Sequence, residues 1–226
     1  MLKELLIIIP IAIFFGAVQV EAYTGFVPGI TLTKEVSNEQ TLLAEQKLNL
    51  TNRYAEPYIN DVFKDNILLN LAYMAGTVQN AGQINWDAVR APSSYSFTLQ
   101  PGEVFAYHDN VLPQYEGRVV QGTNTSFGAA DGYRSSGLLY GDGVCHFASL
   151  INMTARDAGL EVVAPTNHDF AMIPDIDPMY GTAIYYAYGQ PEINMQQNLY
   201  VENTFAVPVK VVFENTGDSL VVRIYK

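Results

Sequence analysis

The chain has one cysteine, three histidines and one tryptophan among 226 residues. A single cysteine excludes an internal disulfide and any metal site built from several thiols, since both need at least two. Neither His-x-x-x-His nor Cys-x-x-Cys spacing occurs. We therefore expect no metal ion and no cofactor, with a zinc site formed by Cys145 and the three histidines as an alternative.

Basic residues are also scarce, because 12 Lys and Arg stand against 23 Asp and Glu, giving a net charge of −11. This balance argues against nucleic acid and against anionic lipid headgroups as partners, since both are negatively charged. Only 15% of the residues are charged, whereas 49% are hydrophobic. Such a chain is not disordered and can bury the core of one domain of ordinary size.

The N-terminus carries one mainly apolar run, from Leu5 to Val20, after the basic start at Lys3. Small residues at Val20 and Ala22 fit a cleavage site, so residues 1–22 are predicted to be a secretory signal peptide. An N-terminal membrane anchor is the alternative, although the run is shorter than the roughly 20 residues of a full span. Either reading predicts an exported chain that is secreted or extracytoplasmic. A lone cysteine in an exported protein is buried, intermolecular or reactive.

The only cysteine lies where a helix is predicted to begin. After Gly141 and Gly143, apolar residues recur with helical spacing, and Gly159 follows the last of them, which predicts a helix over 145–158. Cys145 then lies in the first turn, where unpaired N–H groups and the helix dipole lower the pKa of a thiol. Asp142 opposes this effect if it is close. The competing interpretation is a buried, inert cysteine that packs as a small hydrophobic residue.

The remaining pattern predicts an α+β fold, a mainly antiparallel β domain built around this central helix and preceded by a small helical segment. Residues 35–53 favour helix and residues 57–75 carry an apolar stripe, so we expect a helical hairpin in an N-terminal region over 23–92 and the main domain over 93–226. Alternating or apolar runs predict strands at 95–99, 104–107, 161–164, 182–186, 198–202, 207–214 and 219–225. A loop is expected at 122–137, with turns at 100–103 and 215–218.

A cysteine nucleophile needs a base within hydrogen-bond reach. His146 follows Cys145 directly, so on a helix its side chain points about 100° away. His108 follows a predicted strand, and His168 follows the strand after the central helix. Because a helix–loop–strand return can bring that strand beside the start of the helix, His168 is the predicted base, with His108 and His146 as alternatives. A structural role competes for each histidine.

The segment 95–226 resembles the VanW domain family, named from vancomycin-resistance clusters. The resemblance rests on an ordered set of motifs. These are Pro101-Gly102-Glu103-Val104-Phe105, Gly141-Asp142-Gly143-Val144-Cys145 with Ser149, Ala158-Gly159-Leu160, Asn167-His168-Asp169 and Val222-Arg223-Ile224-Tyr225. The chain departs from the family pattern at Asp142, His146, Ala148 and Asp169, where Gly, Gln, Ser and Ser are usual.

The resemblance implies a cell-wall enzyme similar to the L,D-transpeptidases, with peptidoglycan stem peptides as partners. In that reading Cys145 attacks the carbonyl between the third and fourth residues of a donor stem, and an acceptor amine resolves the thioester into a 3–3 cross-link. The implied catalytic set is Cys145, His168 and Asp169. Substrate or oxyanion contacts are expected from Gly143, Val144, His146, Ser149, Tyr133, Arg134 and His108. A peptidoglycan cysteine peptidase or amidase and a non-catalytic wall-binding module remain alternatives.

Overall fold

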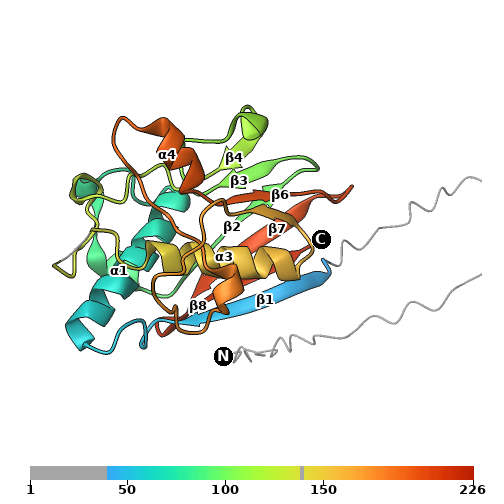
Figure 1. Ribbon diagram of the computed structural model, residues 1–226. Helices are drawn as coiled ribbons and strands as arrows, with labels where there is room; N and C mark the ends of the chain where they lie inside the picture. The colour runs from blue at the N-terminus through green and yellow to red at the C-terminus, as the bar shows by residue number, and fades with distance from the viewer. Residues whose placement is uncertain (1–39, 138–139) are drawn as a thin grey trace, which may run out of the picture. The chain divides into compact units, whose positions relative to one another are not determined.

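The computed structural model describes residues 40–137 and 140–226, which belong to one compact unit. In these two ranges, two four-stranded sheets and four α-helices make up an α+β fold, as predicted (Figure 1). The predicted signal peptide or anchor, residues 1–22, lies outside the described residues. Within the described ranges, no helix combines the length and the apolar character needed to cross a membrane.

The larger sheet is antiparallel throughout, with the strand order β1-β8-β7-β2. Residues that face the interior alternate with partly exposed ones along β7, which is the half-buried pattern of an antiparallel sheet with one solvated face. Asn215 and Gly217 form the predicted turn between the last two strands, with Gly217 at a φ of +96°. The strands are β1 (Leu42–Asn49), β2 (Ser93–Leu99), β7 (Val209–Asn215) and β8 (Ser219–Tyr225).

The smaller sheet has the order β4-β3-β6-β5, in which only the β3–β4 pair is parallel. Its strands are three residues long, and β6 lies between β3 and β5. β4 precedes the central helix in the chain and β5 follows it, so the smaller sheet anchors the chain on both sides of that helix. The strands are β3 (Val104–Ala106), β4 (Val119–Gln121), β5 (Glu161–Val163) and β6 (Tyr200–Glu202).

The central helix α3 (Val144–Asp157) lies across β1 and β8 and also contacts α1 (Figure 1). Its Phe147 is fully buried and packs edge-on against Phe213 of β7 at 5.6 Å between ring centres. Gly159, at a φ of +80°, ends the helix as predicted. The other helices are α1 (Pro57–Met74), α2 (Trp86–Arg90) and α4 (Pro191–Gln196), of which only the first was predicted.

The prediction of a helix over 35–53 is wrong for the described part of that range, which contains β1. Leu, Ala, Glu, Gln and Lys dominate this segment, and all of them favour helices in isolation. However, β8 offers an edge to which β1 adds, pairing Leu48 with Leu220 and Gln46 with Val222. Since β1 and α1 both pack on the main domain, residue 92 does not separate two units.

The predicted strand at 182–186 is extended but joins neither sheet. It lies against α3 instead, because the hydrogen-bond partners of Thr182 and Ile184 are side chains of that helix. This departure from the prediction shapes the surroundings of the cysteine.

Candidate functional site

Cys145 is the second residue of α3, directly after the left-handed cap residue Gly143 and Val144. A side chain at position 143 is excluded twice, because its φ is +98° and a Cβ atom would lie 2.6 Å from the carbonyl oxygen of Phe63 in α1. The glycine therefore lets the start of α3 pack closely against α1. The Val144 N–H donates to Gly141 at 3.0 Å, so it is not available to an oxyanion, contrary to prediction.

The sulfur of Cys145 is held by the backbone of Ile184. The Ile184 N–H donates to Sγ at 3.3 Å, and the thiol in turn donates to the Ile184 carbonyl oxygen at 3.6 Å. Cys145 is half-buried as a residue, and burial of the thiol raises its pKa to about 11. The Ile184 N–H lowers this pKa and the charge of Asp142 raises it. The predicted lowering is thus wrong for this conformation, because loss of hydration outweighs the helix start.

The extended segment after Gly181 separates Cys145 from the strand that leads to His168. Thr182 and Ile184 donate their N–H groups toward α3, whereas the N–H of Ala183 donates to the carbonyl of Thr166 at 3.0 Å. Successive N–H groups of an extended chain point to opposite sides. Thr166 therefore lies across the segment from Cys145, and no hydrogen bond joins the thiol to His168 among the described residues.

His168 borders a cavity of about 200 Å³. Its Nδ1 lies 3.1 Å from the carbonyl oxygen of Ala171, which can only accept, so Nδ1 carries the proton and Nε2 has the lone pair. Burial lowers the pKa of His168, which keeps the ring neutral at pH 7. Asp169, in the predicted catalytic set, lines the cavity, but Ala171 rather than Asp169 orients the imidazole.

His146 is buried between α1 and His168. Its ring centre lies 4.9 Å from that of Phe63 and 6.4 Å from that of His168. Burial, with the positive charge of Arg53 and the proximity of His168, lowers the pKa of His146 to about 3. Its Nδ1 has no hydrogen-bond partner among the described residues. The structure thus places two neutral imidazoles together, and among the described residues neither forms a hydrogen bond with the thiol.

The burial of His146 predicts a loss of stability in acid. Between the unfolded pKa of 6.5 and the folded pKa of about 3, the unfolded chain binds the extra proton, so the free energy of unfolding falls as the pH falls through this window. At pH 4.5 the loss relative to pH 7 is about 2–3 kcal/mol from this residue. Urea unfolding of the His146→Gln variant should therefore show a shallower acid slope than the unsubstituted chain. Parallel slopes would contradict a buried neutral imidazole.

Three further predicted contact residues are held by protein groups. His108 is buried, with Nε2 3.1 Å from the Gln197 carbonyl oxygen, and burial lowers its pKa. Tyr133 is 2% exposed and its hydroxyl bonds Asn70 at 3.0 Å, so the prediction that it contacts substrate is wrong for this conformation. Arg134 remains partly exposed and pairs with Asp65 on α1.

Ser149 has a different role from the predicted one. Its hydroxyl donates to the Cys145 carbonyl at 2.7 Å and accepts the N–H of Thr182 at 2.9 Å. One turn further along α3, the Asn152 amide donates to the Tyr180 carbonyl and to the Thr182 hydroxyl, both at 3.0 Å. The i, i+4, i+7 spacing of Cys145, Ser149 and Asn152 is the sequence signal for this polar face, which the apolar pattern of the helix had obscured.

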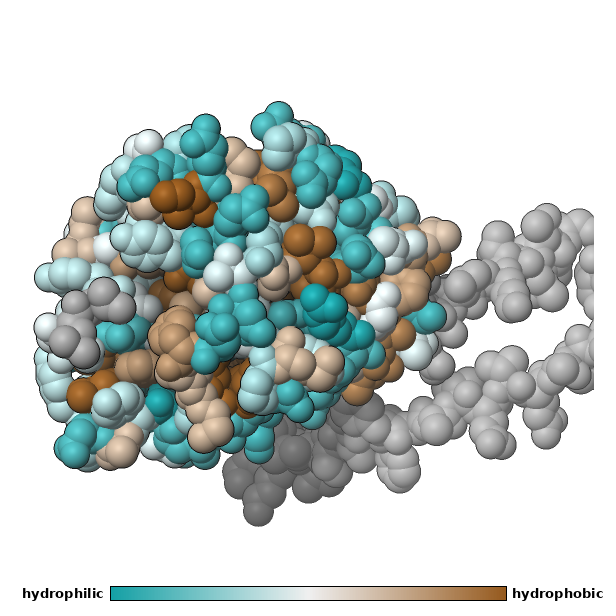
Figure 2. Space-filling view, viewed as in Figure 1, coloured by the Kyte–Doolittle hydropathy of each residue, from teal (hydrophilic) through white to brown (hydrophobic). Residues whose placement is uncertain are grey.

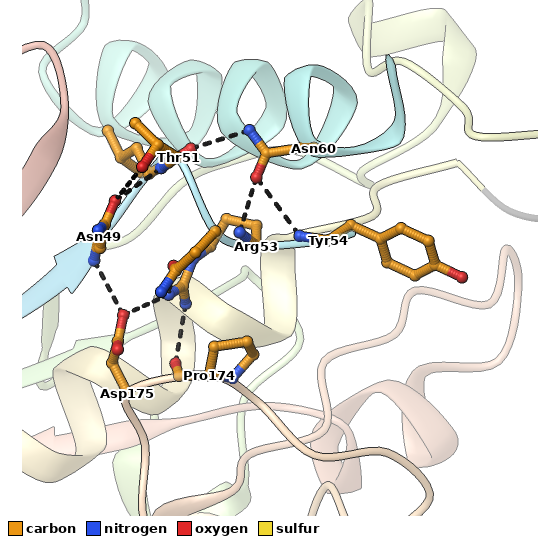
Figure 3. A network of polar contacts seen from close by, with 9 residues as sticks. Asn49, Thr51, Arg53, Tyr54, Asn60, Pro174 and Asp175 are labelled. Carbon is orange, nitrogen blue, oxygen red and sulfur yellow. Dashed lines mark hydrogen bonds and ion pairs between the residues drawn. The ribbon is translucent and has the colours of Figure 1, made fainter. Parts of the chain in front are cut away.

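A partly buried ion pair joins the chain between β1 and α1 to a distant loop (Figure 3). The side chain of Arg53 is 0% exposed and pairs with Asp175, while its Nη1 donates to the Pro174 carbonyl at 2.9 Å. Figure 3 shows Asn60 of α1 above this pair, where its side chain accepts the Arg53 N–H at 2.7 Å. The segment 174–176 is thereby fixed to the chain between β1 and α1.

The surface near the His168 cavity carries exposed apolar side chains. Phe170 is 76% exposed and its ring lies tilted against that of His168, at 4.0 Å between ring centres, and Met172 is 85% exposed. On the face shown in Figure 2, however, apolar patches are small and are separated by hydrophilic side chains. This face therefore offers no large contiguous apolar patch of the kind that marks a protein or membrane interface.

No three His, Cys, Asp or Glu side chains within the described ranges lie together in a way that could hold a metal ion. Cys145 and the three histidines do not form such a group. Comparison with known proteins gave no matching family model, no matching curated protein and no matching solved structure.

Proposed function

We propose that the chain is an exported cysteine acyltransferase of the VanW kind, an L,D-transpeptidase-like enzyme that acts on peptidoglycan stem peptides at the cell wall. The observation that carries the proposal is the place of its only thiol. Cys145 lies in the first turn of α3, at the positive end of the helix dipole, with a backbone N–H of Ile184 directed at its sulfur. The ordered VanW-like motifs supply the substrate class.

The proposed reaction has two steps. Cys145 Sγ forms a bond to the carbonyl carbon between the third and fourth stem residues, the C–N bond breaks, and the thiol proton leaves on the amine of D-alanine. An acceptor amine then attacks the thioester, forms the cross-link and returns a proton to the thiol. His168 carries these protons on Nε2, the nitrogen with the lone pair. Since the Ile184 backbone holds the thiol, the reaction requires the segment 181–185 to move.

Incubation with disaccharide-tetrapeptide muropeptides, followed by mass spectrometry, tests the proposal. Transpeptidation gives dimers that have lost one D-alanine. Shortened monomers alone indicate that water replaces the acceptor amine, which is the peptidase or amidase alternative. Unchanged muropeptides contradict both enzymatic readings.

His168→Ala is expected to slow dimer formation by about 10²–10⁴-fold, the usual contribution of a general base. His146→Gln is the matched control, because His146 lies beside His168 but presents no proton acceptor to the cavity. The control chain should keep a rate within a few-fold of the unsubstituted one. If the control loses the activity and His168→Ala keeps it, the base is misassigned.

A non-catalytic wall-binding module is the second candidate, and one observation favours it. Both hydrogen-bonding capacities of the Cys145 thiol are satisfied by Ile184, and burial raises the thiol pKa to about 11. Such a thiol is protonated at pH 7 and is a poor nucleophile. Binding to isolated peptidoglycan with unchanged muropeptides, for the unsubstituted chain and for Cys145→Ala alike, would establish this reading.

A further inference from the structure

We propose that residues 180–185 form a strap that closes over Cys145 and is latched by Ser149 and Asn152, so that the thiol reacts only when the strap opens. The strap consists of Tyr180, which ends the short 3-10 helix Pro178–Tyr180, and of the extended residues 181–185, and it belongs to neither sheet.

The latch consists of polar bonds on one face of α3. Asn152, in the middle of α3, donates hydrogen bonds to the Tyr180 carbonyl and to the Thr182 hydroxyl, each at 3.0 Å. Ser149 then accepts the Thr182 N–H at 2.9 Å. At the start of the helix, Cys145 completes the series with the Ile184 N–H at 3.3 Å. The nucleophile candidate is thus the last of three successive attachment points.

The far side of the strap is fixed by backbone bonds. The Ala183 N–H donates to Thr166 at 3.0 Å and the Tyr185 N–H donates to Gln197 at 3.3 Å. Gly181 lets the strap pass close to the backbone of His168, since a Cβ atom at position 181 would lie 2.7 Å from the His168 carbonyl oxygen. Thr182, Ala183 and Ile184 are 0%, 7% and 8% exposed, so opening uncovers buried groups and is a rare event.

The strap occupies the place that the proposed chemistry needs. The Ile184 carbonyl oxygen lies 3.6 Å from Sγ, where the reacting carbonyl of a donor peptide would have to approach. The relevance of the strap to catalysis rests on the proposed function. The closure of the strap over the thiol is independent of that function, because a small thiol reagent can measure it without any cell-wall substrate.

Alkylation by iodoacetamide at pH 8 tests the strap in the folded chain, with the same chain in urea as the reference for a free thiol. We expect alkylation of the folded chain to be slower by at least about 10²-fold, as for a thiol exposed only by local opening. Ser149→Ala removes the acceptor of the Thr182 N–H, and Thr182→Val removes a partner of Asn152. Each should accelerate alkylation about tenfold, the usual effect of losing one buried hydrogen bond.

Thr154→Val is the matched control. Thr154 is buried on the same helix and donates to the Leu150 carbonyl at 2.7 Å, as Ser149 does to Cys145, yet it bonds nothing in the strap. Urea unfolding of all variants corrects for changes in global stability. Faster alkylation in the two strap variants than in the control supports the latch. A folded chain that alkylates as fast as the unfolded one, or strap variants no faster than the control, would overturn it, whatever the muropeptide assay shows.

Discussion

Cys145→Ala is expected to abolish the formation of muropeptide dimers while the chain stays folded. The proposed thioester needs a nucleophile at this position, and alanine supplies none. Removal of the nucleophile from a covalent mechanism leaves only the residual contribution of substrate binding, so the loss should be at least about 10³-fold. The measurement is the yield of dimers and of released D-alanine by mass spectrometry.

Cys145→Ser is the control that separates chemistry from packing. A serine hydroxyl can still exchange hydrogen bonds with the Ile184 backbone, so the strap and the start of α3 keep their contacts. Its hydroxyl is a far weaker nucleophile than a thiolate without a base in contact. The serine variant should therefore unfold near the unsubstituted chain in urea, the alanine variant should lose about 1 kcal/mol with its bonds to Ile184, and both should be inactive. Dimer formation by the alanine variant would exclude Cys145 as the nucleophile.

The helices and hairpins that depend on local pattern were predictable from the sequence. Apolar residues at helical spacing, followed by Gly159, located α3 to within one residue at each end. The turn at 215–218 and the apolar run of β8 likewise predicted the closing hairpin. In each case the signal and the structure lie in the same short stretch of chain.

The errors arose where distant contacts overrule local preference. β1 is rich in helix formers but completes a sheet with β8, more than 150 residues later in the chain. The segment 182–186 has the residues of a strand, but its N–H partners are a thiol and a hydroxyl on α3. These strand-forming residues predict an extended segment, but they do not show that the segment bonds to helix side chains and not to another strand.

The candidate site was predictable in its elements but not in its geometry. The start of α3 and the place of His168 after β5 follow from the order of the elements. Whether the imidazole can meet the thiol depends on the strap that holds the thiol, and the path of the strap is set by Thr166 and Gln197 on its far side. The direction of the thiol pKa could not be predicted for the same reason, since burial comes from this strap.

The pairing of Arg53 with Asp175 likewise joins two distant loops, and its loss is expected to have the largest effect on stability. Asp175→Ala should cost about 3–5 kcal/mol, because it leaves a buried guanidinium without its counter-charge. Arg53→Met should cost less, since the remaining Asp175 side chain is 35% exposed and stays hydrated, whereas that of Arg53 is 0% exposed.

Urea unfolding at pH 7 of the two single variants and of the double variant measures this asymmetry. The double variant should be more stable than Asp175→Ala alone, because it removes the uncompensated charge. Asp177→Ala is the matched control, since this nearby carboxylate only caps the Met179 N–H at 3.0 Å and forms no ion pair within the described residues. It should cost about 1 kcal/mol, as for the loss of a cap. Equal losses of unfolding free energy for Asp175→Ala and Asp177→Ala would contradict this account. They would mean that the Pro174 carbonyl and the Asn52 side chain compensate the charge of Arg53 well enough without Asp175, and that the ion pair does not hold the 174–176 turn in place.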